Sequence, residues 1–208
     1  MNLDNNRATL IGEISSPFIF DHEAYGEKFY MVQLSIKRLS GQTDRIPVMV
    51  SQWLFNAEDT CSGVLVRADG QFHSFNQYID GKSHLKLFVF AHDFQIVDCS
   101  LDPESNNDIY LDGYICKRPF YRRTPLGREI TDVLLAVNRS FSKTDYIPCI
   151  AWGRSAKFAS ELSVGDHIGI HGRAQSRKYQ KKIGSDIYET KVAYEISTSK
   201  IEVARGIV

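Results

Sequence analysis

The most restrictive feature of the sequence is an internal repeat with a period near 101 residues. The matching pairs, in order along the chain, are residues 6–12 with 107–113, Gly26 with Gly127, residues 44–48 with 145–149, Gly63 with Gly165, and Gly70 with Gly172. The offset grows to 102 over the last two pairs, which one inserted residue between strands explains. Two copies of one structural plan therefore make up the chain.

A polar stretch with a proline, Cys99-Ser-Leu-Asp-Pro-Glu-Ser-Asn106, separates the copies and is typical of a linker. We therefore expect residues 1–100 to form one domain and residues 101–208 to form a second. The formal net charge of zero hides a division between the copies, because residues 1–104 carry −6 and residues 105–208 carry +6. This asymmetry predicts that only the second copy meets a polyanion.

Each copy consists mostly of segments rich in β-branched and aliphatic residues, which predicts strands. In the second copy we expect strands at residues 109–116, 130–139, 146–152, 166–179 and 187–196, and a short helix at 155–162. The first copy has residues 53–59 in the helical position. The predicted fold is all-β: two tandem OB-type five-stranded barrels, each with one short helix between strands 3 and 4. A pair of other small β-barrels or sandwiches is the alternative.

The sequence offers no support for an enzyme or a membrane protein. It contains no nucleophile elbow, zinc-protease, phosphate-loop or zinc-deaminase motif. Its four cysteines form no C-x-x-C pair, and no apolar run is long enough to span a bilayer. We therefore expect no catalytic residue, no metal, no cofactor and no membrane contact, and a location in the reducing cytoplasm.

Two basic clusters without an acidic residue distinguish the second copy. Residues 117–128 and residues 173–182 each contain five Lys or Arg, with aromatic residues among them. Strand alternation places Arg173, Arg177 and Tyr179 on one face. Cations that follow phosphates and rings that stack on bases are what a single strand needs, although a solvated charged face is the alternative. The candidate nucleic-acid-binding residues here are Phe120, Tyr121, Arg122, Arg123, Arg128, Arg173, Arg177, Lys178, Tyr179, Lys181 and Lys182.

Three further aromatic residues are candidates for the same surface. Phe141 ends the second expected strand beside Arg139 and Lys143, a good position for stacking on a base. Trp152 shares one strand face with Tyr146, but both faces of that strand are apolar. The pattern alone therefore leaves Trp152 either in the core or on the surface.

The second copy resembles the bacterial single-stranded-DNA-binding (SSB) family over nearly its whole length. The shared motifs are Asn107-x-x-x-Leu-x-Gly113, Arg123-Thr-Pro-x-Gly127, Leu135-Ala-Val-Asn-Arg139, Ile147-Pro-Cys-Ile-Ala-Trp-Gly153, Gly165-Asp-x-Ile and Gly172-Arg-x-Gln-Ser-Arg-Lys-Tyr179. The resemblance implies phosphate contact from Arg177 and its basic neighbours, and it implies stacking aromatics at four positions, which are Phe141, Tyr146, Trp152 and Tyr179.

The resemblance also implies an assembly. Family members commonly have one OB domain and form tetramers, so a chain with two domains resembles the members that dimerise, and we expect a homodimer with four barrels; a monomer is the alternative. The family commonly ends in a flexible tail with an acidic tip that recruits other proteins. Here the sequence stops at Val208, directly after the expected last strand, so we expect no recruitment through a tail.

The first copy matches the family weakly. Residues 75–77 (Phe-Asn-Gln) stand where the second copy has residues 177–179 (Arg-Lys-Tyr), and Ser51 stands opposite Trp152. We interpret the first copy as an acidic, degenerate OB barrel that serves assembly or a replication or recombination protein. Its remaining candidates for base stacking are Phe29, Tyr30, Phe72, Phe75 and Tyr78.

The predicted function is sequence-tolerant binding and protection of single-stranded DNA in replication, recombination, repair or mobile-element maintenance at the nucleoid. One alternative is a primosome-type OB adaptor that chiefly docks a protein partner. Another is an RNA chaperone that uses the same groove.

Overall fold

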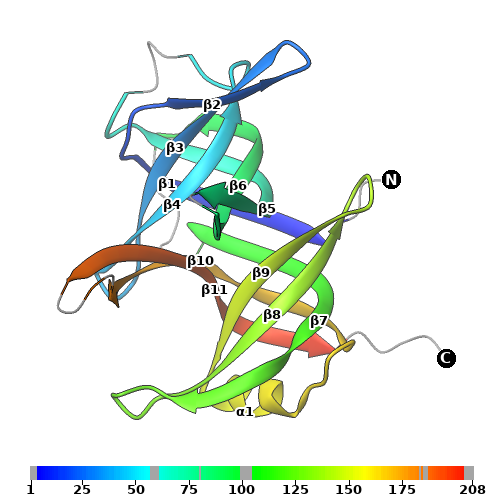
Figure 1. Ribbon diagram of the computed structural model, residues 1–208. Coiled ribbons are helices and arrows are strands. Elements are labelled where there is room, and N and C mark those ends of the chain that lie inside the picture. The colour runs from blue at the N-terminus through cyan, green and yellow to red at the C-terminus, as the bar shows by residue number, and fades with distance from the viewer. Residues whose placement is uncertain are drawn as a thin grey trace.

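The computed structural model describes residues 4–56, 61–79, 81–98, 105–182, 184 and 187–203. Its strands form two consecutive sets, seen as two barrels one above the other in Figure 1. The first set comprises β1 (Asn6–Ile14), β2 (Ile19–Ala24), β3 (Glu27–Lys37), β4 (Thr43–Ser51), β5 (Leu65–Ile79) and β6 (Lys82–Ile96). The second comprises β7 (Asn107–Arg123), β8 (Glu129–Arg139), β9 (Lys143–Trp152), α1 (Gly153–Glu161), β10 (His167–Lys182) and β11 (Tyr188–Val203).

The second set closes into a barrel. β7 pairs with β10 along its N-terminal part and with β8 along the rest. β8 pairs with β9, β9 runs parallel to β11, and β11 pairs with β10, which completes the circuit. The pairing of β7 with β8 shifts register twice over residues 115–120, and such bulges bend a strand enough for it to serve two neighbours.

The first set repeats this circuit, with β1 and β2 in place of the single strand β7. β1 pairs with β3 and β5, β3 pairs with β4, β4 runs parallel to β6, and β6 pairs with β5. β2 extends the edge of β3. The break before β2 contains Pro17, which lacks the backbone N–H that a strand ladder uses. The predicted all-β fold of two tandem OB barrels is confirmed.

Alternation places the core of each barrel. In β8, Val133, Leu135 and Val137 are at most 3% exposed, whereas Leu134 and Ala136 between them are half-buried on the outer face. The outer face of β8 and β9 therefore carries half-buried side chains that can take part in a binding surface.

The repeated glycines at 70 and 172 mark equivalent bulges. The register of β5 with β6 shifts between Asp69 and Gly70, and that of β10 with β11 shifts between His171 and Gly172. A Cβ atom at either glycine would collide with a carbonyl oxygen of the neighbouring strand. Both barrels therefore bend at equivalent glycines, Gly70 and Gly172.

The helix α1 covers one end of the second barrel (Figure 1). It begins two residues before the predicted start and buries Ala156 and Ala159. The helix predicted at residues 53–59 of the first copy is wrong for residues 53–56, none of which is helical, and residues 57–60 lie outside the described part. There the Ser51 hydroxyl accepts a hydrogen bond from the Trp53 amide at 3.2 Å, and Phe55 stacks on Phe18 with ring centroids 4.0 Å apart.

Several strand ends differ from the prediction, and the last strand, expected to end at Ile196, continues to Val203. The first strand of the second barrel continues to Arg123 rather than ending near Cys116, because residues 120–123 pair with residues 129–132 of β8. The β10–β11 hairpin extends as a paired ribbon to Lys182, beyond the expected end at Tyr179. Both basic clusters therefore lie mainly on strands.

The two barrels share one sheet, because β1 pairs antiparallel with β7, from Asn6 opposite Leu111 to Leu10 opposite Asn107. Most of the expected linker, residues 99–104, lies outside the described part of the chain. The carbonyl oxygen of Asn106 accepts a hydrogen bond from the Ile11 amide at 2.8 Å. The division into domains at residues 100 and 101 stays a prediction.

Candidate nucleic-acid interface

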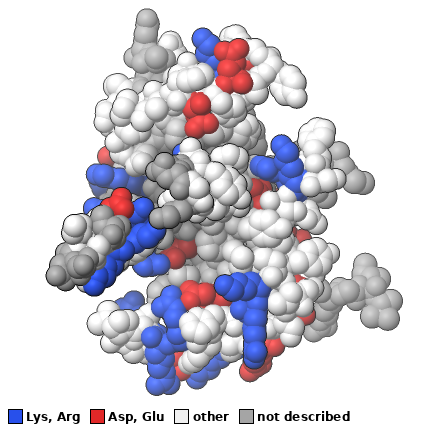
Figure 2. All heavy atoms as spheres, in the orientation of Figure 1, with Lys and Arg blue, Asp and Glu red and all other residues white. Residues whose placement is uncertain are grey.

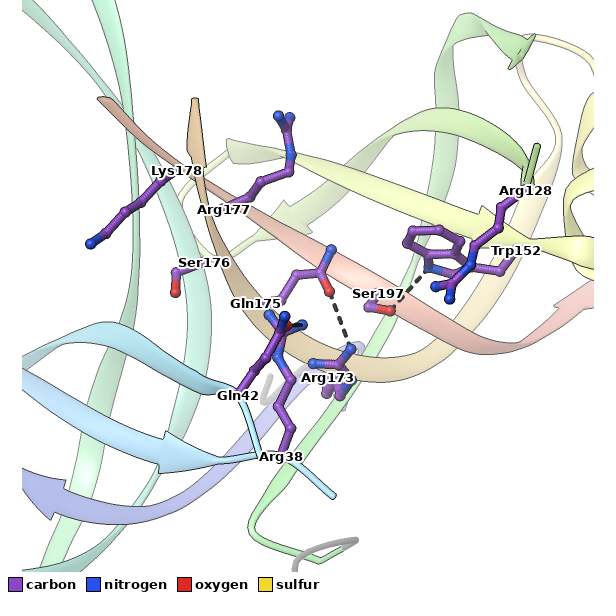
Figure 3. A pocket seen from close by; sticks show the side chains of 10 residues that line it. All are labelled: Arg38, Gln42, Arg128, Trp152, Arg173, Gln175, Ser176, Arg177, Lys178 and Ser197. Atoms are coloured by element: carbon purple, nitrogen blue, oxygen red, sulfur yellow. Dashed lines mark hydrogen bonds between the residues drawn. The ribbon is translucent and has the colours of Figure 1, made fainter. Parts of the chain in front are cut away.

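A hollow of about 570 Å³ lies where the second barrel meets the first, and we call it the inter-barrel hollow (Figure 3). The β3–β4 turn of the first barrel contributes Arg38 and Gln42, which sequence reasoning missed. Gln175, Ser176 and Ser197 also line it. The predicted binding residues that line this hollow are Arg128, Trp152, Arg173, Arg177 and Lys178.

Trp152 lies on the outer face of β9. Ile147, Cys149 and Ala151 point inward and are at most 1% exposed, whereas Trp152 is half-buried beside the hollow. The indole Nε1 donates a hydrogen bond to the Ser197 hydroxyl at 3.1 Å, which fixes the ring on the β11 side (Figure 3). The sequence pattern left Trp152 either in the core or on the surface, and the structure places it on the surface.

The side chains of β10 form an ordered polar row beside Trp152. An Arg173 guanidinium nitrogen donates to the Gln175 side-chain oxygen at 3.2 Å. The Gln175 amide nitrogen donates to the Glu195 carboxylate at 2.6 Å, and Arg177 Nε lies 3.6 Å from the same carboxylate. Glu195 is 6% exposed and stands opposite Gln175 on β11, so it orients this row from beneath. The sequence alone does not identify Glu195 as a partner of this row, because the register between β10 and β11 determines which side chains meet.

Tyr179 continues the row toward the hairpin tip. It is 38% exposed, and the Arg177 guanidinium carbon lies 5.9 Å from the centre of its ring. Lys178, Lys181 and Lys182 are exposed, and none has an acidic side chain within ion-pair distance among the described residues. Figure 2 shows basic side chains gathered over this hairpin and over the lower part of the second barrel.

Two further hollows continue the surface. One of about 660 Å³ is lined by Arg123 and shares Arg128 and Trp152 with the inter-barrel hollow, so the two hollows adjoin at these side chains. Another, of about 810 Å³, crosses the outer face of β8 and β9, where Phe120 and Tyr121 of β7 line it together with Lys117 and Arg118.

The first basic cluster is free of acids in sequence but not in space. β8 places Asp132 and Glu129 opposite the end of β7. Arg122 donates two hydrogen bonds to Asp132, at 2.7 and 3.1 Å, and Arg123 lies 3.3 Å from Glu129. Hydrogen bonding from Tyr121 lowers the pKa of Glu129. Arg122 and Arg123 are therefore already paired, which leaves Lys117, Arg118 and Arg128 as the cations without an acidic partner among the described residues.

Phe141 and Tyr146 lie away from the inter-barrel hollow. Phe141 is 94% exposed in the β8–β9 turn, where its φ is +61°. This turn faces the first barrel, because the neighbouring Arg139 contacts His73 and the Tyr146 amide donates to the Ser74 hydroxyl at 2.7 Å. Figure 1 shows the β8–β9 turn at the opposite end of the second barrel from the β7–β8 turn. The four rings implied by the resemblance thus divide between two places.

The first barrel lacks the equivalent of the Trp152 site. Ser51 occupies that position, is buried, and contacts the Glu27 carboxylate. Phe72 is 1% exposed and belongs to the core, and Phe29 is also buried, so the expectation that they could stack on bases is wrong. Phe75 and Tyr78 are 58% and 76% exposed.

Other kinds of site have little support. No group of three His, Cys, Asp or Glu side chains suited to a metal ion occurs among the described residues. No helix in the described ranges is long and apolar enough to cross a membrane. The cysteines whose structure is described, Cys61, Cys116 and Cys149, are free thiols, and burial raises the pKa of Cys149.

Comparison with solved structures shows the same fold over both barrels. A crystal structure of the wild-type single-stranded DNA binding protein from Thermus aquaticus superposes with a TM-score of 0.71. The match covers 98% of this chain and 95% of that chain, at 22% sequence identity.

Comparison with known sequences concerns the second barrel. A single-stranded DNA-binding protein of Clostridium tetani is 41% identical over 93 residues, which are 41% of this chain and 64% of that protein. Single-stranded DNA-binding protein B of Bacillus subtilis is 36% identical over 93 residues and is matched over 82% of its length. Other relatives are matched over only 56–60% of their own length. The Single-strand binding protein family matches residues 106–203, and the chain belongs to that family.

Proposed function

We propose that the protein binds single-stranded DNA with little sequence preference, in the basic groove of the second barrel. The observation that carries this proposal is Trp152, an indole fixed at the surface between two adjoining hollows that cations line. A fixed ring can stack on any base, because every base has a π-face. Arg128 and Lys178 have no acidic partner among the described residues and are free to contact phosphates.

The proposed division of labour follows from the differences between the barrels. Residues 101–208 supply the groove, whereas residues 1–100 have a serine in place of Trp152 and a net negative charge. We propose that the first barrel mainly supports assembly or contacts a replication or recombination protein. Protection of transient single strands during replication, repair, recombination or mobile-element maintenance is the corresponding cellular role.

We expect tight binding to a dT oligomer, weaker binding to duplex DNA, and a strong dependence on salt. Each cation that contacts a phosphate releases a counterion and adds about −0.7 to the slope of log affinity against log salt for single strands. Fluorescence anisotropy of labelled dT, U and duplex oligomers across a salt series measures all three expectations. A preference for duplex or a flat salt response would contradict the proposal, and tighter binding to the U oligomer would favour an RNA chaperone.

We also propose that two copies form a homodimer with four barrels. The opposite net charges of the two halves favour contacts between unlike barrels of neighbouring copies, and closed two-fold assemblies are the commonest oligomers. The first barrel moreover exposes Ile19, Phe20 and Trp53, each more than half exposed. Light scattering at low micromolar concentration is expected to give twice the chain mass of 23.7 kDa. A mass equal to one chain, unchanged by added DNA, would exclude the dimer.

A further inference from the structure

Two arginines share one buried carboxylate where the inter-barrel hollow meets the first barrel. Asp44 of β4 is 1% exposed. Arg38 of the first barrel donates to it through Nε at 2.6 Å and through Nη2, and Arg173 of the second barrel lies 3.3 Å away. The Ser176 amide donates to the same carboxylate at 2.7 Å. We call Asp44, Arg38, Arg173 and Ser176 the Asp44 corner.

An equivalent corner occurs on the other side of the junction. Asp145 is fully buried and accepts a hydrogen bond from the Ser74 amide at 2.8 Å. Arg139 Nε lies 3.7 Å and His73 Nδ1 lies 3.1 Å from the Asp145 carboxylate. We call Asp145, Arg139, His73 and Ser74 the Asp145 corner. The repeat relates the members pairwise: Asp44 to Asp145, Arg38 to Arg139, and Ser176 to Ser74.

The two corners differ in the basic groups that lie beside the carboxylate. The repeat places Gln71 where the Asp44 corner has Arg173. The Asp145 corner therefore has one guanidinium and the His73 ring beside its carboxylate, whereas the Asp44 corner has two guanidinium groups. Because the Asp145 corner joins the barrels with one arginine and a histidine, such a junction does not need a second arginine. Burial, and after it the nearby charge of Arg38, lower the pKa of Arg173.

Positive charge is in excess along the inter-barrel hollow. The cationic side chains that line it are Arg38, Arg128, Arg173, Arg177 and Lys178. Among the described residues, the carboxylates paired with these five are Asp44 and Glu195. A half-buried site with more cations than anions is stabilised by a bound anion, because the charges are only partly solvated.

We propose that the Asp44 corner is a phosphate site, in which Arg38 and Arg173 bind one phosphodiester of a single strand that leaves the Trp152 platform. This inference rests on the proposed function and deepens it, because it gives the first barrel a direct contact with the strand. Figure 3 shows Arg38 and Arg173 side by side and facing the same hollow as Trp152. The Gln42 side chain accepts a hydrogen bond from Arg38 Nη1 at 3.2 Å, and a phosphate oxygen can take its place.

The test changes an exposed residue that does not contact the buried carboxylate. Gln42→Glu places a negative charge beside Arg38, and Gln42→Lys places a positive one there. The matched control is Lys143→Gln, because the repeat relates Lys143 to Gln42 and this change also lowers the net charge by one at an exposed position. Anisotropy is measured with a dT oligomer of about 30 nucleotides, enough for two OB barrels, across a salt series, and circular dichroism checks that each variant melts like the wild type.

We expect Gln42→Glu to weaken binding about threefold to tenfold at low salt and to reduce the salt slope by about 0.7, the loss of one phosphate contact. Gln42→Lys is expected to strengthen binding by a similar factor, and Lys143→Gln to change it less than about twofold. If the wild type binds but Gln42→Glu and Gln42→Lys behave like Lys143→Gln, the phosphate site is wrong and the proposed function stands. If the wild type does not bind the oligomer, the proposed function itself fails.

Discussion

Trp152→Ala is expected to weaken binding of a dT oligomer by about 5- to 150-fold. This range corresponds to the roughly 1–3 kcal/mol that one base–aromatic stack contributes. The upper part of the range applies if the strand passes through both hollows, because Trp152 lies at the point that they share. The ring is half-buried on the outer face of β9 and outside the hydrophobic core, so its removal should change the thermal stability little.

The matched control is Trp53→Ala, since Trp53 is the other tryptophan of the chain and is 75% exposed on the first barrel. It is expected to change affinity by less than about twofold. Binding is measured by anisotropy of a labelled oligomer, because either change alters the intrinsic fluorescence. A second variant, Trp152→Phe, keeps a ring but loses the hydrogen bond to Ser197, and it should retain most of the affinity. Equal losses for Trp152→Ala and Trp53→Ala would place the DNA on both barrels and refute the division of labour.

The fold could be predicted from the sequence because its signals are local and occur twice. Segments rich in β-branched and aliphatic residues identified the strands, and two glycines that match across the repeat, Gly70 and Gly172, lie at equivalent bulges where a Cβ atom would collide with the neighbouring strand. The short helix of the first copy was predicted only by position. There the turn at Ser51 and the stacking of Phe55 on Phe18, a residue 37 positions earlier, replace it at residues 53–56.

The basic residues of the candidate site could be predicted from the sequence, but the ion pairs that they form could not. The sequence pattern identified Arg128, Arg177 and Lys178, which line one hollow. It could not show that Glu129 and Asp132 neutralise Arg123 and Arg122, because cross-strand register sets those pairs. Nor could it place Arg38 beside Arg173, since that contact joins residues far apart in sequence across the barrel junction.

The Asp145 corner shows how much the junction depends on one side chain. Asp145 is fully buried, and Arg139 and His73 contact its carboxylate and each other. Asp145→Ala would remove the counter-charge and leave a partly buried guanidinium without a carboxylate. Removing one partner of a buried ion pair costs about 3–5 kcal/mol of unfolding free energy. We expect the lower end, about 3 kcal/mol, because the Arg139 side chain is 31% exposed.

Urea denaturation of Asp145→Ala, with Asp132→Ala as control, tests this expectation. The Arg122–Asp132 pair is exposed, so its loss should cost at most about 1 kcal/mol. A cost for Asp145→Ala no larger than that of Asp132→Ala would contradict the role of the corner.

The same carboxylate predicts a dependence on pH. Burial alone would raise the pKa of Asp145, but hydrogen bonds from His73 and the Ser74 amide, with the charges of His73 and Arg139, hold it below the ordinary value. A carboxyl group with a lowered pKa in the folded state stabilises the fold above its unfolded pKa of about 3.9. That stabilisation is lost as the pH falls through the folded pKa. The difference in unfolding free energy between wild type and Asp145→Ala should therefore shrink below about pH 4, as the carboxylate is protonated in the folded state. A difference that stays constant into strong acid would show that the Asp145 carboxylate does not carry this charge in the fold.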